Sequence, residues 1–199
     1  MQKVAVECYR STGMRPFLDD LAALRMRVFH DWPYLYEGSI EEERRYLNHF
    51  AESDQSVLVL ARAEDGRIVG CSTAMALSEA ETAFRQPFIE AGWNLDEMMY
   101  FGESVLLPQW RGRGLGHAFF DQREAMARAL GKTGACFCAV QRPADHPLRP
   151  AQARDLAPFW SKRGYRRRPE LTTRFPWTDR GETSETLKPM VFWTRALLD

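Results

Sequence analysis

Apolar residues recur along this chain at helical and strand-like spacings, and the two patterns divide it into elements. Within residues 15–30, Leu21, Leu24 and Val28 recur every three or four positions, as on one face of an amphipathic helix. Residues 40–51 contain no Gly or Pro and are rich in Glu and Arg, which also favours a helix. We therefore expect two helices near the start of the chain.

Apolar runs at residues 56–63 and 67–77 predict two strands. They flank Glu64-Asp65-Gly66, a turn sequence that favours a β-hairpin. Residues 78–97, which include Pro87, have an irregular pattern, and we expect a loop or a short helix there. Further strands are expected at residues 4–9, 98–107, 134–141, 171–177 and 190–195, and further helices at residues 118–130 and 155–164.

Length and charge limit the classes of function that the chain can serve. With 199 residues and 45% hydrophobic content, residues 1–199 can bury one substantial core and are expected to form a single domain. Lys plus Arg and Asp plus Glu both total 27, so the formal net charge is zero. Such a chain has no overall field that attracts nucleic acid or an anionic membrane, and we expect neither as a partner.

Cysteine use and the absence of long apolar segments point to the cytoplasm. Cys8, Cys71, Cys136 and Cys138 have neither CxxC spacing nor a histidine at metal-ligand distance, so we expect a reduced protein without a metal. No signal-peptide segment opens the chain, and no uncharged run approaches the ~18 residues that a membrane span requires. We therefore expect a soluble, cytoplasmic protein.

The most informative segment is Pro108–His117, with the sequence PQWRGRGLGH, between a strand-like run and a helical one. Its three alternate glycines allow backbone N–H groups to approach an anion without a Cβ in the way. The following helix adds its unpaired N–H groups and the positive end of its dipole. Arg111 and Arg113 supply counter-charge, so we expect this segment to bind a diphosphate.

Two better-known glycine motifs are excluded by spacing. A dinucleotide fingerprint requires a third Gly three residues after the second, and His117 occupies that position. A P-loop requires Gly-Lys-Ser/Thr, which the segment lacks. The remaining pattern, Arg111-x-x-Gly114-x-Gly116 preceded by Pro108, resembles the acyl-CoA signature of the GNAT superfamily of N-acetyltransferases.

A second segment resembles the same family. Residues 159–165, FWSKRGY, are similar to the aromatic-aromatic-x-x-x-Gly-aromatic segment that closes the last helix in many members. The expected order of strands and helices also resembles that of the GNAT fold over nearly the whole chain. The resemblance implies an α/β (α+β) fold with a mixed, mostly antiparallel sheet, splayed between its fourth and fifth strands and flanked by about four helices.

The resemblance further implies that acetyl-CoA is the co-substrate. In the family, the pantetheine arm pairs with the end of the fourth strand, and a backbone N–H there polarises the thioester carbonyl. The implied cofactor-binding residues are Leu106, Leu107, Arg111, Gly112, Arg113, Gly114, Leu115, Gly116 and His117.

Acetyl transfer also requires that the acceptor amine lose its proton, because an alkyl amine has a pKa near ~10.4. Glu103 occupies a position where some family members place an acidic residue, and we expect it to be the catalytic carboxylate. The alternative to a catalytic role is a structural one, in which Glu103 pairs with a nearby Arg. In that case Glu97 is the second candidate for the catalytic carboxylate. Many members carry a Tyr in the last helix that protonates the leaving thiolate, but Trp160 occupies that position, and indole cannot supply the proton.

The aromatic loop with Trp32, Tyr34 and Tyr36 lies where the family's acceptor wall usually forms, although core packing explains any one of these rings equally well. We expect an N-acetyltransferase that acts on a primary amine of a small molecule or a protein, by direct attack in a ternary complex. A homodimer is compatible with the sequence. The alternatives are a non-catalytic acyl-CoA-binding sensor, which Trp160 supports, and a nucleotide-binding domain, which the missing motif residues disfavour.

Overall fold

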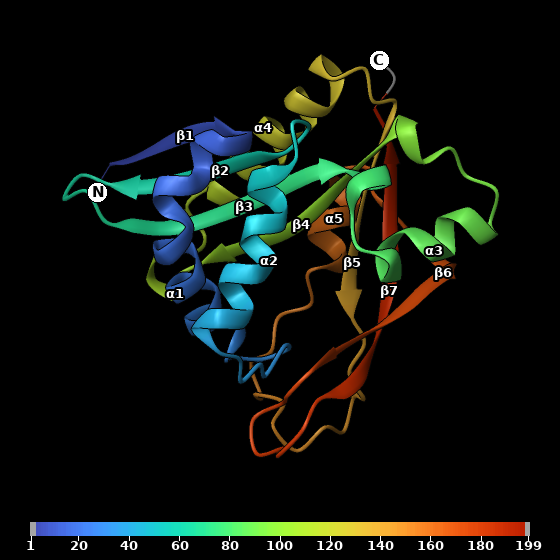
Figure 1. Cartoon of the computed structure of the whole chain (residues 1–199). Helices are drawn as coiled ribbons and strands as arrows, with labels where there is room; N and C mark the ends of the chain where they lie inside the picture. Colours follow the sequence, from blue (N-terminus) through green and yellow to red (C-terminus); the bar gives the residue numbers. More distant parts are fainter. Residues whose placement is uncertain (1–2, 198–199) are drawn as a thin grey trace.

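A seven-stranded sheet organises residues 3–197, the part of the chain that the computed structural model describes (Figure 1). Its strand order is β1-β2-β3-β4-β5-β7-β6, and every neighbouring pair is antiparallel except β4 and β5. The expected mixed, mostly antiparallel sheet is therefore confirmed. The strands are β1 (Val4–Arg10), β2 (Val57–Ala63), β3 (Ile68–Ala76), β4 (Met98–Leu106), β5 (Gly134–Val140), β6 (Arg166–Trp177) and β7 (Thr186–Ala196).

Helices cover both faces of this sheet. In Figure 1, α1 and α2 lie on one face and α4 lies on the other, and Leu21, Leu47 and Phe119 are buried beneath them. The α-helices are α1 (Leu18–Phe29), α2 (Ile40–Glu52), α3 (Thr82–Glu90), α4 (Leu115–Ala129) and α5 (Ala157–Lys162). Short 3-10 segments are η1 (Ser11–Phe17), η2 (Leu77–Glu79), η3 (Leu95–Glu97) and η4 (Pro108–Trp110).

Helix α3 occupies the segment whose sequence pattern is irregular. Pro87 lies inside the helix and has no N–H to donate to the carbonyl of Ala83, four residues earlier. The hydroxyl of Thr173 on β6 donates to that carbonyl instead, at 2.6 Å. A residue 90 positions away in sequence therefore offsets part of the cost of the proline, which local patterns cannot reveal.

Strand β6 begins at Arg166, five residues before the expected start at residue 171. The added segment, 166–170, is polar because β6 is an edge strand of the sheet and its side chains are largely exposed. Its pairing with β7 shifts register between Arg168 and Thr172, where Pro169 lies. A proline is tolerated at such an irregularity on an edge strand.

The sheet opens between β4 and β5, as expected for its fourth and fifth strands. The two strands pair only from Met98 opposite Gly134 to Tyr100 opposite Cys136. Beyond Tyr100 they diverge, and Figure 1 shows the gap widening toward the end of β4. Backbone groups on this side of β4 therefore face the opening rather than a neighbouring strand.

A β-bulge in β4 sets the direction of the side chains beside this opening. Ser72 of β3 pairs with Ser104, but Ala74 pairs with Phe101, so Gly102 and Glu103 together oppose one residue of β3. The extra residue turns the Glu103 side chain to the face that carries α1 and α2. Gly102 is required here, because an added Cβ would lie 2.6 Å from Oγ1 of Thr73 and 2.9 Å from the Phe50 ring.

Arg123 of α4 supports the bulge from the opposite face. Its guanidinium, 1% exposed as a residue, donates to the carbonyls of Thr73 and Glu103 at 3.3 and 3.2 Å and to the Ser104 hydroxyl at 2.8 Å. The same group lies 4.4 Å from the centroid of the Phe101 ring. Burial lowers the pKa of Arg123 to about 10, which leaves it charged at neutral pH.

Replacing Arg123 with Met should destabilise the fold strongly, because the buried carbonyls of Thr73 and Glu103 would lose their donor. We expect a loss of about 3 kcal/mol in the free energy of unfolding, measured by chemical denaturation. The control is Arg44→Met, which removes an exposed, solvent-screened ion pair with Asp19 and should leave the free energy of unfolding nearly unchanged. Equal, small losses in both variants would show that Arg123 does not support the bulge.

Candidate active site

The glycine turn after β4 presents an open backbone surface. Gly112 and Gly114 have φ values of +75° and +82°, which favour glycine, and an added Cβ at either position would meet nothing within 4 Å. Gly114 is the N-cap of α4, and the first bond within the helix runs from the N–H of Ala118 to its carbonyl at 3.1 Å. The N–H groups of residues 115–117 precede that bond and have no acceptor within the helix.

Side chains around the turn are partly committed to protein contacts. Nε of Arg111 donates to the carbonyl of Leu106 at 3.1 Å, and the Arg113 guanidinium lies 4.7 Å from the Trp110 ring centroid. Nδ1 of His117 lies 3.1 Å from a guanidinium nitrogen of Arg163. Leu115 is buried, whereas Arg111, Arg113 and His117 are exposed. The positive side chains therefore surround a surface that the main chain provides.

The last residues of β4 differ in the direction of their backbone groups. The N–H of Leu107 donates to the carbonyl of Val69 at 3.0 Å. Because successive residues of an antiparallel strand point their N–H groups to opposite sides, the N–H of Leu106 faces the opening between β4 and β5. Leu106 thus presents a main-chain donor there, while Leu107 is engaged with β3.

Glu103 belongs to a buried charge cluster. Oε2 of Glu103 lies 2.7 Å from a guanidinium nitrogen of Arg25, and Nε of Arg25 donates to Glu43. The Tyr46 hydroxyl donates to Oε2 at 3.4 Å. Burial alone would lower the pKa of Arg25, but the charges of Glu103 and Glu43 raise it well above its ordinary value. The other carboxylate oxygen of Glu103, Oε1, is buried and has no hydrogen-bond partner.

A cavity of about 520 Å³ opens beside Glu103, and residues of β4, β5 and β6 and of helices α1, α2 and α3 line it. Tyr34 and Tyr36 of the predicted acceptor wall line this cavity together with Glu103. Trp32 does not; its ring packs 5.3 Å from that of His146 instead. The aromatic lining residues are Phe29, Tyr34, Tyr36, Tyr46, Phe84, Tyr100, Phe175 and Trp177.

Arg142, just after β5, holds the aromatic loop against the cavity. Its guanidinium donates to the carbonyls of Pro33 and Tyr34 at 2.8 and 2.6 Å, and to both oxygens of Asp179 at 2.6 and 2.8 Å. Nε1 of Trp177 donates to the same Tyr34 carbonyl at 3.1 Å. Burial raises the pKa of the Tyr34 hydroxyl, so this side chain is neutral at physiological pH.

Trp160 lies in α5, at the position where many family members carry a tyrosine. Trp160 packs 5.0 Å from the ring of Phe137 and 5.2 Å from that of Trp193. The nearby Tyr165 hydroxyl is buried and donates to Glu124 at 3.0 Å. Gly164, with a φ of +84°, ends the helix as expected, because its N–H and that of Tyr165 donate back into the last turn.

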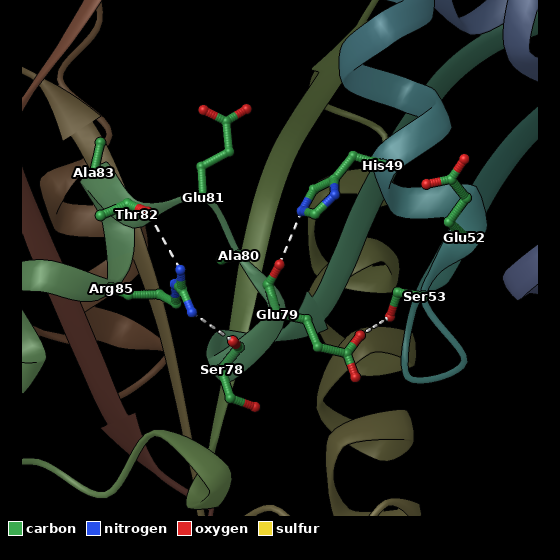
Figure 2. A pocket seen from close by; sticks show the side chains of 10 residues that line it. All are labelled: His49, Glu52, Ser53, Ser78, Glu79, Ala80, Glu81, Thr82, Ala83 and Arg85. Carbon is green, nitrogen blue, oxygen red and sulfur yellow. Dashed lines mark hydrogen bonds between the residues drawn. The ribbon is translucent and has the colours of Figure 1, made fainter.

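A shallower groove of about 740 Å³ adjoins the cavity and is lined by two segments, the end of α2 and residues 78–85 around the start of α3 (Figure 2). Nε2 of His49 lies 2.8 Å from the carbonyl of Glu79, and the Glu79 carboxylate contacts Ser53. His49 and Glu81 line both the groove and the cavity. These two side chains therefore mark the passage from one to the other.

The sequence singles out Glu103 and gives a pairing with a nearby Arg as the alternative to a catalytic role. The structure has such a pair, with Arg25, but neither Arg25 nor Glu43 was named from the sequence. Arg25 follows Leu21 by four residues on the buried face of α1, and Glu43 precedes Leu47 by four on the buried face of α2. Charged residues at apolar positions of a helix are a detectable signal of buried pairing. Glu97, the substitute for Glu103, lies outside the cavity and contacts Asn94 and Thr133.

Residues 3–197 contain neither a metal-binding group nor a membrane-spanning helix. No group of three His, Cys, Asp or Glu residues in this range could hold a metal ion. No helix in the same range has the length and apolar character needed to cross a membrane.

Solved structures with the same fold include several acetyltransferases. An acetyltransferase of the GNAT family from Staphylococcus aureus Mu50 has a TM-score of 0.59 and 14% identity, covering 98% of this chain and 100% of its own. One from Streptococcus pneumoniae has a TM-score of 0.59 and 15% identity, covering 98% and 99%. The protein yncA of Salmonella typhimurium, solved with its cofactor acetyl-CoA, has a TM-score of 0.58 and 9% identity, covering 99% and 95%.

At such low sequence identities, these structural similarities show a shared fold alone. A comparison with curated protein sequences returns no match. The sequence itself matches the family model of the acetyltransferase (GNAT) family over residues 23–151, which include the part of α1 that carries Arg25, the whole of α2 and β4, and the glycine turn. The chain therefore belongs to the GNAT family of acetyltransferases.

Proposed function

We propose that this protein transfers the acetyl group of acetyl-CoA to a primary amine by direct attack in a ternary complex. The observation that carries the proposal is the arrangement along β4. An open glycine turn follows the strand. Glu103, three residues before Leu106 on the same strand, lines an aromatic cavity and has one buried carboxylate oxygen without a partner. We further propose that residues 1–199 act as one domain.

The turn fits the diphosphate of CoA. The backbone N–H groups of residues 112–116 would hold the phosphates, since the space beside Gly112 and Gly114 is open and the helix dipole favours negative charge there. Arg111, Arg113 and His117 would supply further positive or hydrogen-bonding groups. Acetyl-CoA, when bound, supplies an activated acetyl group.

Leu106 would stabilise the charge that develops on the thioester oxygen. Its N–H faces the opening between β4 and β5, whereas that of Leu107 is already bound to Val69. A main-chain donor fixed in this way stabilises an oxyanion by about 3 kcal/mol relative to a site without it.

Glu103 would orient the acceptor and remove its proton. Arg25 and Tyr46 hold Oε2, which leaves Oε1 without a partner and would let it accept from the ammonium group of an acceptor in the cavity that Glu103 lines. The C–N bond then forms as the C–S bond breaks. Of the two protons that the ammonium group loses, one ends on the CoA thiol and the other passes to solvent.

The thiolate would leave without a dedicated acid. Trp160 packs on Phe137 and Trp193, and the Tyr165 hydroxyl is bound to Glu124, so neither residue supplies a proton. A thiol pKa near ~8.5 makes such departure feasible. The same observation supports a second candidate function, a non-catalytic acyl-CoA sensor, which would bind acetyl-CoA without turnover.

We propose a cytoplasmic location, because the cysteines are reduced. All four are free thiols, and Cys71, Cys136 and Cys138 are buried. Burial raises the pKa of Cys138, which lines the cavity, to about 12, so it is a poor nucleophile at neutral pH. This supports direct transfer rather than a cysteine relay.

Gly114→Val should weaken acetyl-CoA binding at least about tenfold, because the added side chain would fill the space assigned to the phosphates. The matched control is Gly66→Val, since Gly66 has nearly the same φ, +85°, and equally open surroundings but lies in the β2–β3 turn. Calorimetric titration of both folded variants measures the difference. Equal affinity in the two would remove the turn from the binding site.

Glu103→Gln should lower turnover by about a hundredfold at pH 7, with a smaller loss as the pH rises toward the amine pKa near ~10.4. The free amine then no longer needs a base. Thiol release from acetyl-CoA with a primary amine measures the rate from pH 6 to 9. Glu97→Gln, an acid outside the cavity, should keep the wild-type profile.

A constant ratio of Glu103→Gln to wild-type rates across this pH range would return Glu103 to a structural role. Acetyl-CoA binding without thiol release, over a broad set of amines, would favour the sensor function.

A further inference from the structure

The cavity beside Glu103 is acidic although the whole chain is neutral. Five carboxylates line it against two guanidinium groups, which gives a formal charge of −3 with His49 neutral. Arg25 is already paired with Glu43 and Glu103, and Arg45 is exposed on α2. The lining carboxylates are Glu42, Glu43, Glu81, Glu103 and Glu185.

The rest of the lining also suits a cation. Aromatic rings from several elements surround the space, and their faces attract ammonium groups while their bodies contact methylene groups. Independently of the excess of carboxylates, Glu103, a residue that lines this space and is 5% exposed, has one carboxylate oxygen, Oε1, that is buried without a hydrogen-bond partner. A buried carboxylate oxygen without a donor is a binding position for a charged N–H group.

Glu81 provides a second carboxylate in the lining of the same cavity, where the groove adjoins it. It is half-buried at the start of α3, and its side chain makes no hydrogen bond or ion pair with any described residue. Figure 2 shows its carboxylate standing clear of the other groove residues. The hydroxyl of Tyr46 lies near enough to both acids that, after burial, the charges of Glu103 and Glu81 raise its pKa.

We propose that the acceptor is a small aliphatic diamine, with the reacting amine at Glu103 and the distal ammonium group at Glu81. This inference rests on the proposed function and names its substrate class. An acceptor with a carboxylate in place of the second ammonium would face a negative lining whose buried guanidinium, that of Arg25, is already paired with Glu43 and Glu103. The aromatic walls accommodate the methylene chain between the two charges.

Three compounds with the same carbon chain test the proposal: diaminobutane, aminobutane and 4-aminobutanoate. They differ only in a distal positive, neutral or negative group. We expect kcat/KM for diaminobutane to exceed that for aminobutane at least about tenfold, with 4-aminobutanoate lowest. The advantage should fall as the salt concentration rises, because ion pairing at a partly exposed site is screened.

Glu81→Gln should remove most of the preference for diaminobutane over aminobutane, measured as the ratio of the two kcat/KM values. The control is Glu90→Gln at the other end of the same helix, where the carboxylate is exposed and contacts Gln86. Glu90→Gln should keep the full preference. An unchanged preference in Glu81→Gln would overturn the assignment of Glu81.

Binding separates failure of this inference from failure of the proposed function. Calorimetric titration of the protein–CoA complex with each compound measures the charge preference without turnover. Equal affinity or equal turnover for all three compounds would overturn the diamine proposal while the acetyltransferase function stands. Preferential binding of diaminobutane without acetylation of any amine would overturn the proposed reaction and leave a diamine site.

Discussion

The bulge in β4 is the constraint on which the site depends. It places Gly102 and Glu103 opposite one residue of β3, so that the Glu103 carboxylate and the Tyr100 ring face the same cavity. Such an irregularity breaks the hydrogen bonding of the ladder, and Arg123 satisfies the carbonyls of Thr73 and Glu103 from the other face. A regular strand would point Glu103 toward α4 and remove its carboxylate from the cavity.

On the cavity side, the fold balances buried charge incompletely. Arg25 pairs with both Glu43 and Glu103, which offsets much of the desolvation cost of all three groups but leaves an excess negative charge and one oxygen without a donor. Removing a polar group from water without a partner costs free energy that a bound ligand can recover. The same cluster that costs stability therefore favours binding of a cation.

Local chemistry explains which features could be predicted from the sequence. The hairpin at Glu64–Gly66, the strand before the glycine turn and the end of α5 at Gly164 depend on spacing and turn residues, and the structure has them. The local pattern places Arg25 and Glu43 on the buried faces of their helices, but their pairing with Glu103 depends on how α1 and α2 pack onto β4. Helix α3 was obscured by Pro87, whose cost Thr173 offsets from β6. Within the aromatic loop, Tyr34 and Tyr36 line the cavity and Trp32 does not, because contacts made by Arg142 and Trp177 set the loop's orientation.

The central claim is that the turn after β4 holds acetyl-CoA, and titration of the purified protein with acetyl-CoA in a calorimeter tests it most directly. ATP and NAD serve as parallel ligands, because each carries a diphosphate that a non-selective glycine turn would also accept. We predict a micromolar Kd for acetyl-CoA, roughly −8 kcal/mol, with neither control ligand competing. Failure of acetyl-CoA to bind at millimolar concentration, or tighter binding of ATP or NAD, would contradict the account.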